Sequence, residues 1–183
     1  MPENNKKLSL KQLNRISLEE YKTQDKLPII IVLDNIRSMS NIGSIFRTSD
    51  AFKIEAIHLC GITSRPPHRE IRKTALGATE SVSWKYFPTT MDSIEELKEK
   101  AYTIISVEQV ENSIMLHDYQ PIKNAKIALV MGNEVNGVEQ DVIDTSDLCI
   151  EIPQYGTKHS LNVSISAGLV IWHVFQTLFL AKK

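Results

Sequence analysis

Short apolar runs that alternate with helical segments constrain the fold of this chain more than any other feature. The runs are rich in Ile, Val and Leu, and the segments between them carry apolar residues at helical spacing. Alternation of this kind predicts a mainly parallel sheet flanked by helices, because parallel neighbours need a long crossover connection. The expected fold class is therefore α/β, with strands at residues 29–33, 56–60, 84–87, 103–107, 127–131 and 148–152.

The helices are expected between and around these strands. Ser40 or Asn41 is expected to cap a helix that runs through Phe52, and Asp92 a helix over residues 93–101. A short amphipathic helix over residues 8–21 is expected as an N-terminal extension of the domain. The remaining expected helices are residues 69–76, 138–144 and 161–180.

Length and composition predict a single domain over residues 1–183. A chain of 183 residues that is 42% hydrophobic can bury one sizeable core. Its start lacks the apolar run of a secretion signal, and Cys60 and Cys149 lie in apolar runs, so we expect two buried, reduced thiols in a cytoplasmic protein. The stretch 168–181 is interrupted by polar residues and is shorter than the roughly 20 residues of a membrane span, so no membrane partner is expected.

Three polar stretches follow expected strands and carry the candidate chemistry. They are NIGSIFR at residues 41–47, MGNEVNG at 131–137 and IPQYGTKHSLNVS at 152–164. Loops at the carboxyl ends of parallel strands are where α/β proteins usually bind ligands. The chain has no glycine-rich dinucleotide fingerprint, no phosphate loop and no paired Cys or His motif, so a nucleotide triphosphate or a metal is not expected.

Each motif, taken alone, also fits an ordinary structural role. Arg47 could bind a phosphate with its planar guanidinium, or pair with the acid Glu134. Gly132 and Gly137 could let the backbone approach a ligand, or simply form a turn. Ser or Asn at the start of the last helix could be no more than a helix cap.

Basic residues gather in two places although the net charge is −1. One cluster is near the N-terminus, and the other follows the second expected strand; both are either RNA contacts or solvated faces. They comprise Lys6, Lys7, Lys11 and Arg15, and Arg65, His68, Arg69, Arg72 and Lys73.

The last expected helix, residues 161–180, is apolar over most of its circumference. One sheet face rarely covers so much, so we expect part of it to contact a second subunit. The alternative is a helix that packs under the N-terminal one.

Together, in this order and spacing, the three motifs resemble the TrmH (SpoU) branch of the SPOUT superfamily of RNA 2′-O-ribose methyltransferases. The likeness runs from about residue 29 to residue 172. The resemblance implies a homodimer that uses S-adenosyl-L-methionine and has a C-terminal trefoil knot, whereas general folding rules predict an open sheet. The matching residues are Asn41, Gly43 and Arg47, then Gly132, Glu134 and Gly137, then Ile152, Pro153, Gly156, Ser160, Leu161, Asn162 and Ser164.

The resemblance also implies roles for individual residues. The implied cofactor contacts are Glu108, Gln109, Gly132, Ile152 and Leu161, and the implied catalytic residues are Arg47, Asn41, Glu134, Ser160 and Asn162. A guanidinium is almost never deprotonated, so we favour an electrostatic role for Arg47, in which it holds the adjacent phosphate and the developing oxyanion. The proton would then leave through that phosphate, Ser160 or water.

The expected substrate is structured RNA, contacted by Arg65, Arg69, Arg72 and Lys73. Transfer RNA is favoured over ribosomal RNA, because 21 basic and 22 acidic residues are nearly balanced and no extra N-terminal RNA-binding domain is expected. The alternatives are a ribosomal RNA methyltransferase, a non-catalytic RNA-binding protein that retains the fold, and an enzyme that methylates a small molecule or a base.

Overall fold

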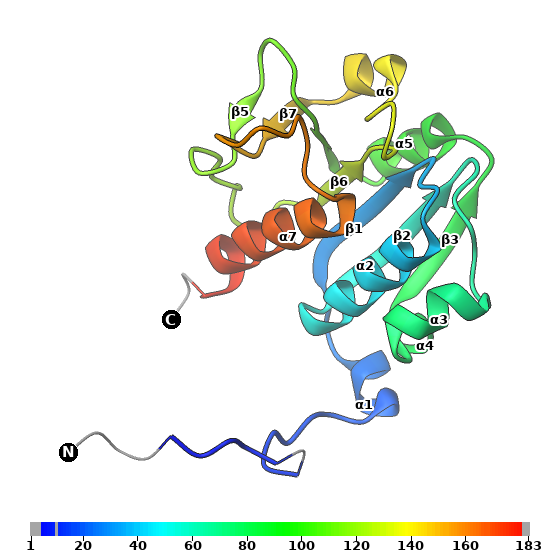
Figure 1. The fold of residues 1–183 in the computed structure, drawn as a ribbon, viewed down its shortest axis with the longest axis vertical. Helices are drawn as coiled ribbons and strands as arrows, with labels where there is room; N and C mark the ends of the chain where they lie inside the picture. Colours follow the sequence, from blue (N-terminus) through cyan, green and yellow to red (C-terminus); the bar gives the residue numbers. More distant parts are fainter. Residues whose placement is uncertain (1–4, 10, 181–183) are drawn as a thin grey trace.

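A parallel seven-stranded sheet forms the centre of the protein (Figure 1). The computed structural model describes residues 5–9 and 11–180. The strand order is β3-β2-β1-β6-β4-β7-β5, and each neighbouring pair is parallel, which confirms the expected α/β class. The strands are β1 (Leu27–Asp34), β2 (Ile54–Cys60), β3 (Ser83–Phe87), β4 (Thr103–Val107), β5 (Ile114–Met115), β6 (Ile127–Met131) and β7 (Leu148–Glu151).

Helices cover both faces of this sheet. One face carries α2 (Met39–Ala51), α3 (Arg69–Ala75), α4 (Ala78–Ser81) and α7 (Val163–Phe179), and the other carries α5 (Thr90–Glu99) and α6 (Gln140–Thr145). A short α1 (Leu18–Thr23) packs beside α4.

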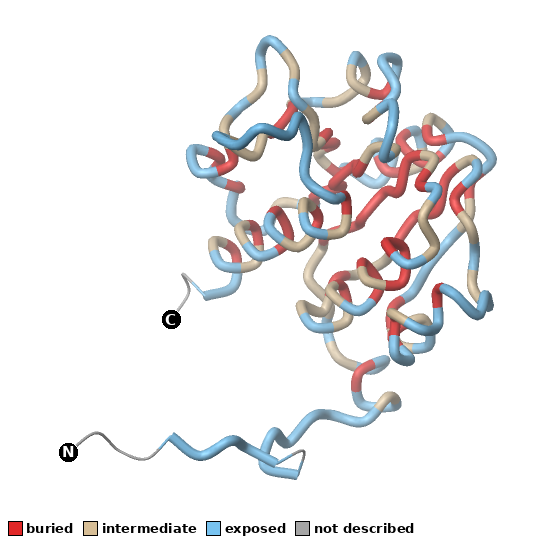
Figure 2. The backbone as a smooth tube through the Cα atoms, viewed as in Figure 1, coloured by how far each residue is buried: buried red, intermediate tan, exposed pale blue. Residues whose placement is uncertain are grey.

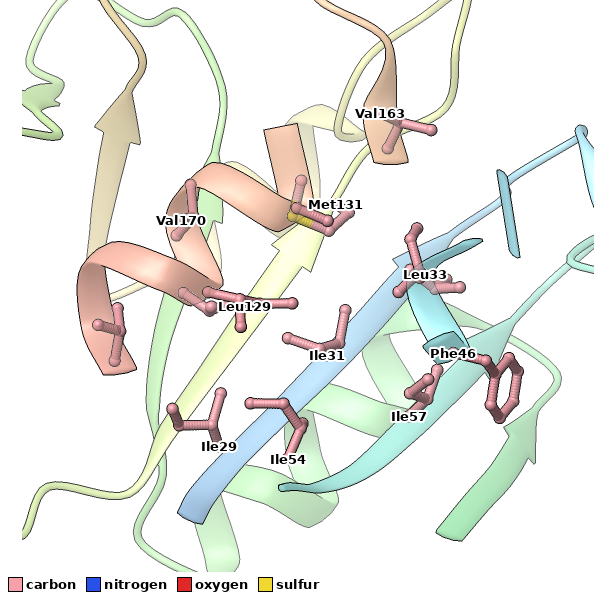
Figure 3. Close-up of a cluster of buried hydrophobic side chains, with 14 of the residues drawn as sticks. Ile29, Ile31, Leu33, Phe46, Ile54, Ile57, Leu129, Met131, Val163 and Val170 are labelled. Carbon is pink, nitrogen blue, oxygen red and sulfur yellow. The ribbon is translucent and has the colours of Figure 1, made fainter. Parts of the chain in front are cut away.

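The core is divided by the sheet into two clusters, because successive side chains of a strand point to opposite faces. In β1, Ile29, Ile31 and Leu33 face the α2 and α7 side, where Phe46 and Val170 meet them (Figure 3). The alternate residues of the same strand face α5 and α6. Burial is concentrated along the sheet and the inner sides of the helices, as Figure 2 shows. A strand buried on both faces explains why β1 has no polar alternation.

The expected N-terminal helix over residues 8–21 is wrong in extent. Only α1 is helical, because Ser17 and Glu20 form a capping box that starts a helix at Leu18. Upstream, Asn14 has a left-handed φ of 45°, which interrupts any helix there. Leu13 is exposed, so no packing surface supports a longer helix. Residue 10 of the expected helix lies outside the described residues.

Two of the expected helix caps are also wrong. Ser38 caps α2, with its Oγ accepting from the backbone N–H of Asn41 at 3.3 Å, so Asn41 is itself helical. Thr89 caps α5, and Asp92 is the partner that closes the capping box three residues later. In both cases an equally good capping residue lies a short distance upstream.

Other expectations can be compared directly with the structure. Cys60 and Cys149 are both free and buried, as predicted. In the part of the chain that the structure describes, no helix is both long enough and apolar enough to cross a membrane. The trefoil knot implied by the resemblance stays a prediction.

Candidate active site

A cavity of about 530 Å³ opens at the carboxyl ends of β4, β6 and β7, beside the start of α7. Three segments form it: the end of β4 with the residues that follow it, the loop after β6 with the second motif, and the loop after β7 with the third motif. The cavity is lined by every residue that the resemblance implied as a cofactor contact, namely Glu108, Gln109, Gly132, Ile152 and Leu161. Glu134, Ser160 and Asn162 line it as well.

The two glycines of the second motif are required by close contacts and, at Gly137, by the backbone conformation. A Cβ at Gly132 would lie 2.3 Å from the backbone N of Val138, and a Cβ at Gly137 would lie 2.2 Å from Oε2 of Glu108. Gly137 also has a φ of 71°, which side chains rarely adopt. The carboxylate of Glu108 accepts from the backbone N–H of Val138 at 3.0 Å, so β4 and the glycine turn are joined at the cavity wall.

A second link closes the other side of the cavity. The side-chain Nε2 of Gln109 donates to the backbone carbonyl of His159 at 2.9 Å. This bond ties the end of β4 to the loop between β7 and α7, which otherwise lies exposed from Tyr155 to Asn162. Gln109 therefore shapes the cavity as well as lining it.

Three of the implied catalytic residues form one hydrogen-bonded row. Nδ2 of Asn162 donates to Oδ1 of Asn41 at 3.1 Å, and Nδ2 of Asn41 donates to Oε1 of Glu134 at 3.1 Å. The row brings together the starts of α2 and α7 and the loop after β6, one from each motif. Asn162 also caps α7 by accepting from the backbone N–H of Ser164 at 2.9 Å, as expected.

The Glu134 carboxylate is held by backbone as well as by Asn41. It accepts from the N–H groups of Arg37 at 2.9 Å and of Ser38 at 3.0 Å. Burial alone would raise the pKa of Glu134, but the hydrogen bonds from these two amides, from its own amide and from Asn41 outweigh burial and lower the pKa below its usual value. Glu134 is therefore an anion that fixes the loop after β1 against the loop after β6.

Sequence reasoning missed the anchor of this loop. Nδ2 of Asn133 donates to the backbone carbonyl of Asn35 at 2.6 Å, and its Oδ1 accepts from the N–H groups of Val135 and Asn136. Asn35 in turn bridges Asp34 and Glu139 through its Nδ2. Asn133 lies inside the second motif, which was the available signal.

Arg47 lies apart from this row. It is exposed in the third turn of α2 and does not line the cavity. Among the described residues no ion pair joins Arg47 to Glu134, so the structure does not show the pairing of Arg47 with that acid. The catalytic role that the resemblance implies for Arg47 therefore stays a prediction.

Gly43 serves helix packing and not ligand approach. A Cβ there would lie 2.3 Å from the backbone carbonyl of Ile71, so α3 crosses α2 closely at this point. The same helix, α3, carries the expected RNA contacts Arg69, Arg72 and Lys73, which are all exposed. Arg65 lies separately, with its guanidinium 4.3 Å from the centre of the Tyr86 ring.

Comparisons with known proteins agree with this geometry. Residues 28–172 match the model of the SpoU rRNA Methylase family. The chain is 31% identical over 159 residues to the 23S rRNA (guanosine-2'-O-)-methyltransferase RlmB of Neisseria meningitidis serogroup B, an alignment that covers 86% of this chain and 62% of that protein. The chain thus spans about three fifths of the length of the curated relatives that it matches.

Two solved structures share the fold. The A. aeolicus TrmH/SpoU tRNA modifying enzyme superposes with a TM-score of 0.77 at 22% identity, over 87% of this chain and 80% of that one. The AdoMet-bound rRNA methyltransferase from Sinorhizobium meliloti gives a TM-score of 0.75 at 24% identity, over 88% and 60% of the two chains. The second and third motifs line one cavity, and Asn41 of the first motif is hydrogen-bonded to Glu134 and Asn162 in its lining. Since the family model also spans most of the chain, this protein belongs to the SpoU methylase family, in its TrmH branch.

Proposed function

We propose that the protein transfers the methyl group of S-adenosyl-L-methionine to a ribose 2′-hydroxyl of structured RNA. The observation that carries this proposal is the row Asn162, Asn41 and Glu134, which joins all three family motifs at the mouth of one cavity. Family membership supports the same reaction class.

The cavity suits the proposed cofactor in its size and in its lining. Ile152 and Leu161 offer apolar contact, and Gln109 and Ser160 offer hydrogen-bonding groups. The tight turn at Gly132 and Gly137 brings backbone to the wall where a Cβ would collide. When bound, the cofactor would supply a methyl group on a positively charged sulfur.

The chain's own residues would prepare the hydroxyl that attacks this methyl group. A ribose hydroxyl is a poor nucleophile until its proton leaves, and the alkoxide that develops needs a nearby positive charge. Arg47 is exposed and keeps its charge, so it can hold both the adjacent phosphate and the oxyanion. Asn41, Glu134 and Asn162 would fix the ribose, and the proton would leave through the phosphate, Ser160 or water.

We infer that the active form is a homodimer. The outer side of α7 exposes large apolar side chains at helical spacing, whereas its inner side is buried in the core. The N-terminal helix does not cover them, because α1 packs beside α4 instead. An exposed apolar strip of this kind is typical of a subunit interface. Its members are Ile165, Leu169, Trp172 and Phe179.

Two classes of RNA are candidates. The near balance of 21 basic and 22 acidic residues supports transfer RNA, a compact substrate that a small basic surface can hold. The 31% identity to a relative named for 23S ribosomal RNA supports ribosomal RNA as the second candidate.

Mass spectrometry of RNA nucleosides tests the proposal. The purified protein is incubated with S-adenosyl-L-methionine and, separately, with undermodified transfer RNA and with ribosomal RNA. We expect one 2′-O-methylated nucleoside to accumulate in one of these pools. A methylated base or a methylated small molecule would contradict the ribose assignment. Binding of RNA without any transfer to either pool would favour the non-catalytic alternative.

A further inference from the structure

Positive charge is segregated into two short segments of this chain. Residues 5–17 carry four basic and no acidic side chains, and residues 65–73 carry four basic and one acidic side chain. The rest of the chain therefore holds 13 basic against 21 acidic side chains. A polyanion would be repelled by most of this surface, so it can approach favourably only where these segments lie.

The segment on α3 forms a shallow basic cavity. Pro67, Arg69, Arg72 and Lys73 line a hollow of about 400 Å³. The acid of this segment, Glu70, pairs with Lys73 at 2.8 Å. Among the described residues no carboxylate pairs with Arg69 or Arg72, which leaves two guanidinium groups free to bind an anion.

This cavity lies close to the proposed active site through α2. Oγ1 of Thr74 donates to the backbone carbonyl of Ser40 at 3.0 Å, beside the close contact of Gly43 with α3. On α2, Ser40 and Arg47 share an exposed strip, and Asn41 is turned toward α7. The basic side of α3 therefore continues along the surface toward Arg47.

The N-terminal segment, residues 5–17, leads into α1, which packs beside the helix that follows α3. Residues 5–9 and 11–17 are exposed and run away from the sheet before α1 (Figures 1 and 2). Tyr21 is buried and anchors α1 beside α4, the helix that directly follows α3. An exposed basic arm is thus tethered, through α1, to the helix that follows the basic α3.

We propose that α3 and residues 5–17 form one docking surface for the phosphate backbone of the RNA substrate. This inference rests on the proposed function. Two separated basic elements fit the phosphates of a folded RNA, because contacts from guanidinium and ammonium groups position a nucleic acid without reading its sequence. Arg65, held over Tyr86, extends the surface along the loop before α3.

Salt-dependent binding of unfractionated transfer RNA tests this surface. One variant combines Arg69→Gln and Arg72→Gln, and a second replaces Lys6, Lys7, Lys11 and Arg15 by Gln. The control combines Lys123→Gln and Lys126→Gln, which removes two exposed charges that belong to neither basic segment. Each lost phosphate contact should lower the slope of log K against log salt by about 0.7 to 0.9.

We expect the α3 variant to bind less tightly at low salt with a slope reduced by about 1.5. The arm variant removes four charges, so its slope should fall by up to about 3 if all four contact phosphates. The control should bind like the wild type. Affinity and slope equal to the control in both variants would overturn the proposal, as would binding to phosphatidylserine vesicles without binding to RNA. If wild-type protein binds RNA through this surface but transfers no methyl group, the docking surface stands and the proposed function fails.

Discussion

Asn162 and Asn41 lie 121 positions apart in the sequence, yet the Nδ2 of one donates to the Oδ1 of the other at 3.1 Å. This bond connects the first turns of α7 and α2, and Asn41 passes the connection on to Glu134. Asn41 is buried, and its side chain donates to Glu134 and accepts from Asn162. Removal of either partner would therefore leave a buried polar atom of Asn41 without a hydrogen bond.

A double-mutant cycle on Asn41→Ala and Asn162→Ala should therefore show coupling. Each single variant is expected to lose much of the methyl-transfer rate, and the double variant should lose less than the product of the two losses. Residues in one hydrogen-bond network typically couple by about 0.5–3 kcal/mol. The measurement is the second-order rate constant for transfer to RNA, and strictly additive effects would show that the row does not act as a unit.

Cofactor binding should stabilise the protein and should depend on Gly132. Saturation at about 100 times Kd adds about 2.7 kcal/mol to the free energy of unfolding, which thermal melting detects as a higher Tm. Gly132→Ala places a Cβ 2.3 Å from backbone atoms and should abolish this rise. Gly168→Ala adds the same carbon to α7 in open space and serves as the control. A wild-type Tm that ignores millimolar cofactor would contradict the cofactor assignment.

Arg47→Ala should abolish methyl transfer and leave cofactor affinity nearly unchanged, because Arg47 does not line the cavity. Arg47→Lys should also transfer poorly, since an ammonium group cannot replace the planar guanidinium, whose several N–H groups can bind phosphate and oxyanion together. Single-turnover transfer and calorimetric cofactor binding separate the two effects. Substantial turnover by either variant would mean that Arg47 has no part in the chemistry.

If Arg47 serves the cavity of the other subunit, mixed dimers should regain activity. Homodimers of Arg47→Ala and of Asn162→Ala are both expected to be inactive. After equal mixing and subunit exchange, half of the dimers combine the two variants, and each of these has one intact site of two. Activity should then recover to roughly a quarter of the wild-type value. Persistent inactivity after confirmed exchange would place both residues in the site of one subunit.

The buried His58 should make stability depend on pH. Burial lowers its pKa to about 4, and the attraction of Glu96 only partly opposes this. The unfolded chain takes up a proton near pH 6.5 that the native protein does not, so stability is complete above that pH and falls as the pH drops toward 4. Between pH 7 and pH 4.5 the expected loss is about 2–3 kcal/mol.

Urea unfolding of wild type and His58→Asn at these two pH values checks this prediction. Asn can keep a polar partner for Ser93, whose Oγ lies 2.7 Å from Nδ1 of His58. The variant should lose less stability than the wild type over this interval, whatever its absolute stability. An equal loss in both proteins would show that other groups cause the pH dependence.

The sheet was predictable because burial on both faces demands continuous apolar strands, and such runs are visible in the sequence. Ile29 and Ile127 both begin runs that the structure confirms as paired strands. The strand β5 was not predictable, because its two residues at the sheet edge leave no pattern. The N-terminal helix was predicted too long, because a helical pattern without a packing surface does not stabilise a helix.

The site was predictable as a set of residues but not as a set of contacts. The motifs name Asn41, Glu134 and Asn162, yet only the fold shows that they form one row. The hydrogen bonds from the amides of Arg37 and Ser38 to Glu134 have no sequence signal, because every residue except proline carries a backbone N–H. The sequence around Gly43 does not distinguish a glycine that approaches a ligand from one that, as the structure shows, lets another helix pack closely.

The central claim is that this cavity and Arg47 deliver a methyl group to a ribose hydroxyl of RNA. Its most direct test uses S-adenosyl-L-methionine with an isotope-labelled methyl group, RNA, and either wild-type protein or Arg47→Ala. Nucleosides released by digestion are then examined by mass spectrometry, with fragmentation that separates base from ribose. The account predicts labelled ribose with the wild-type protein and none with Arg47→Ala. Label on a base, or no label in RNA with the wild-type protein, would contradict it.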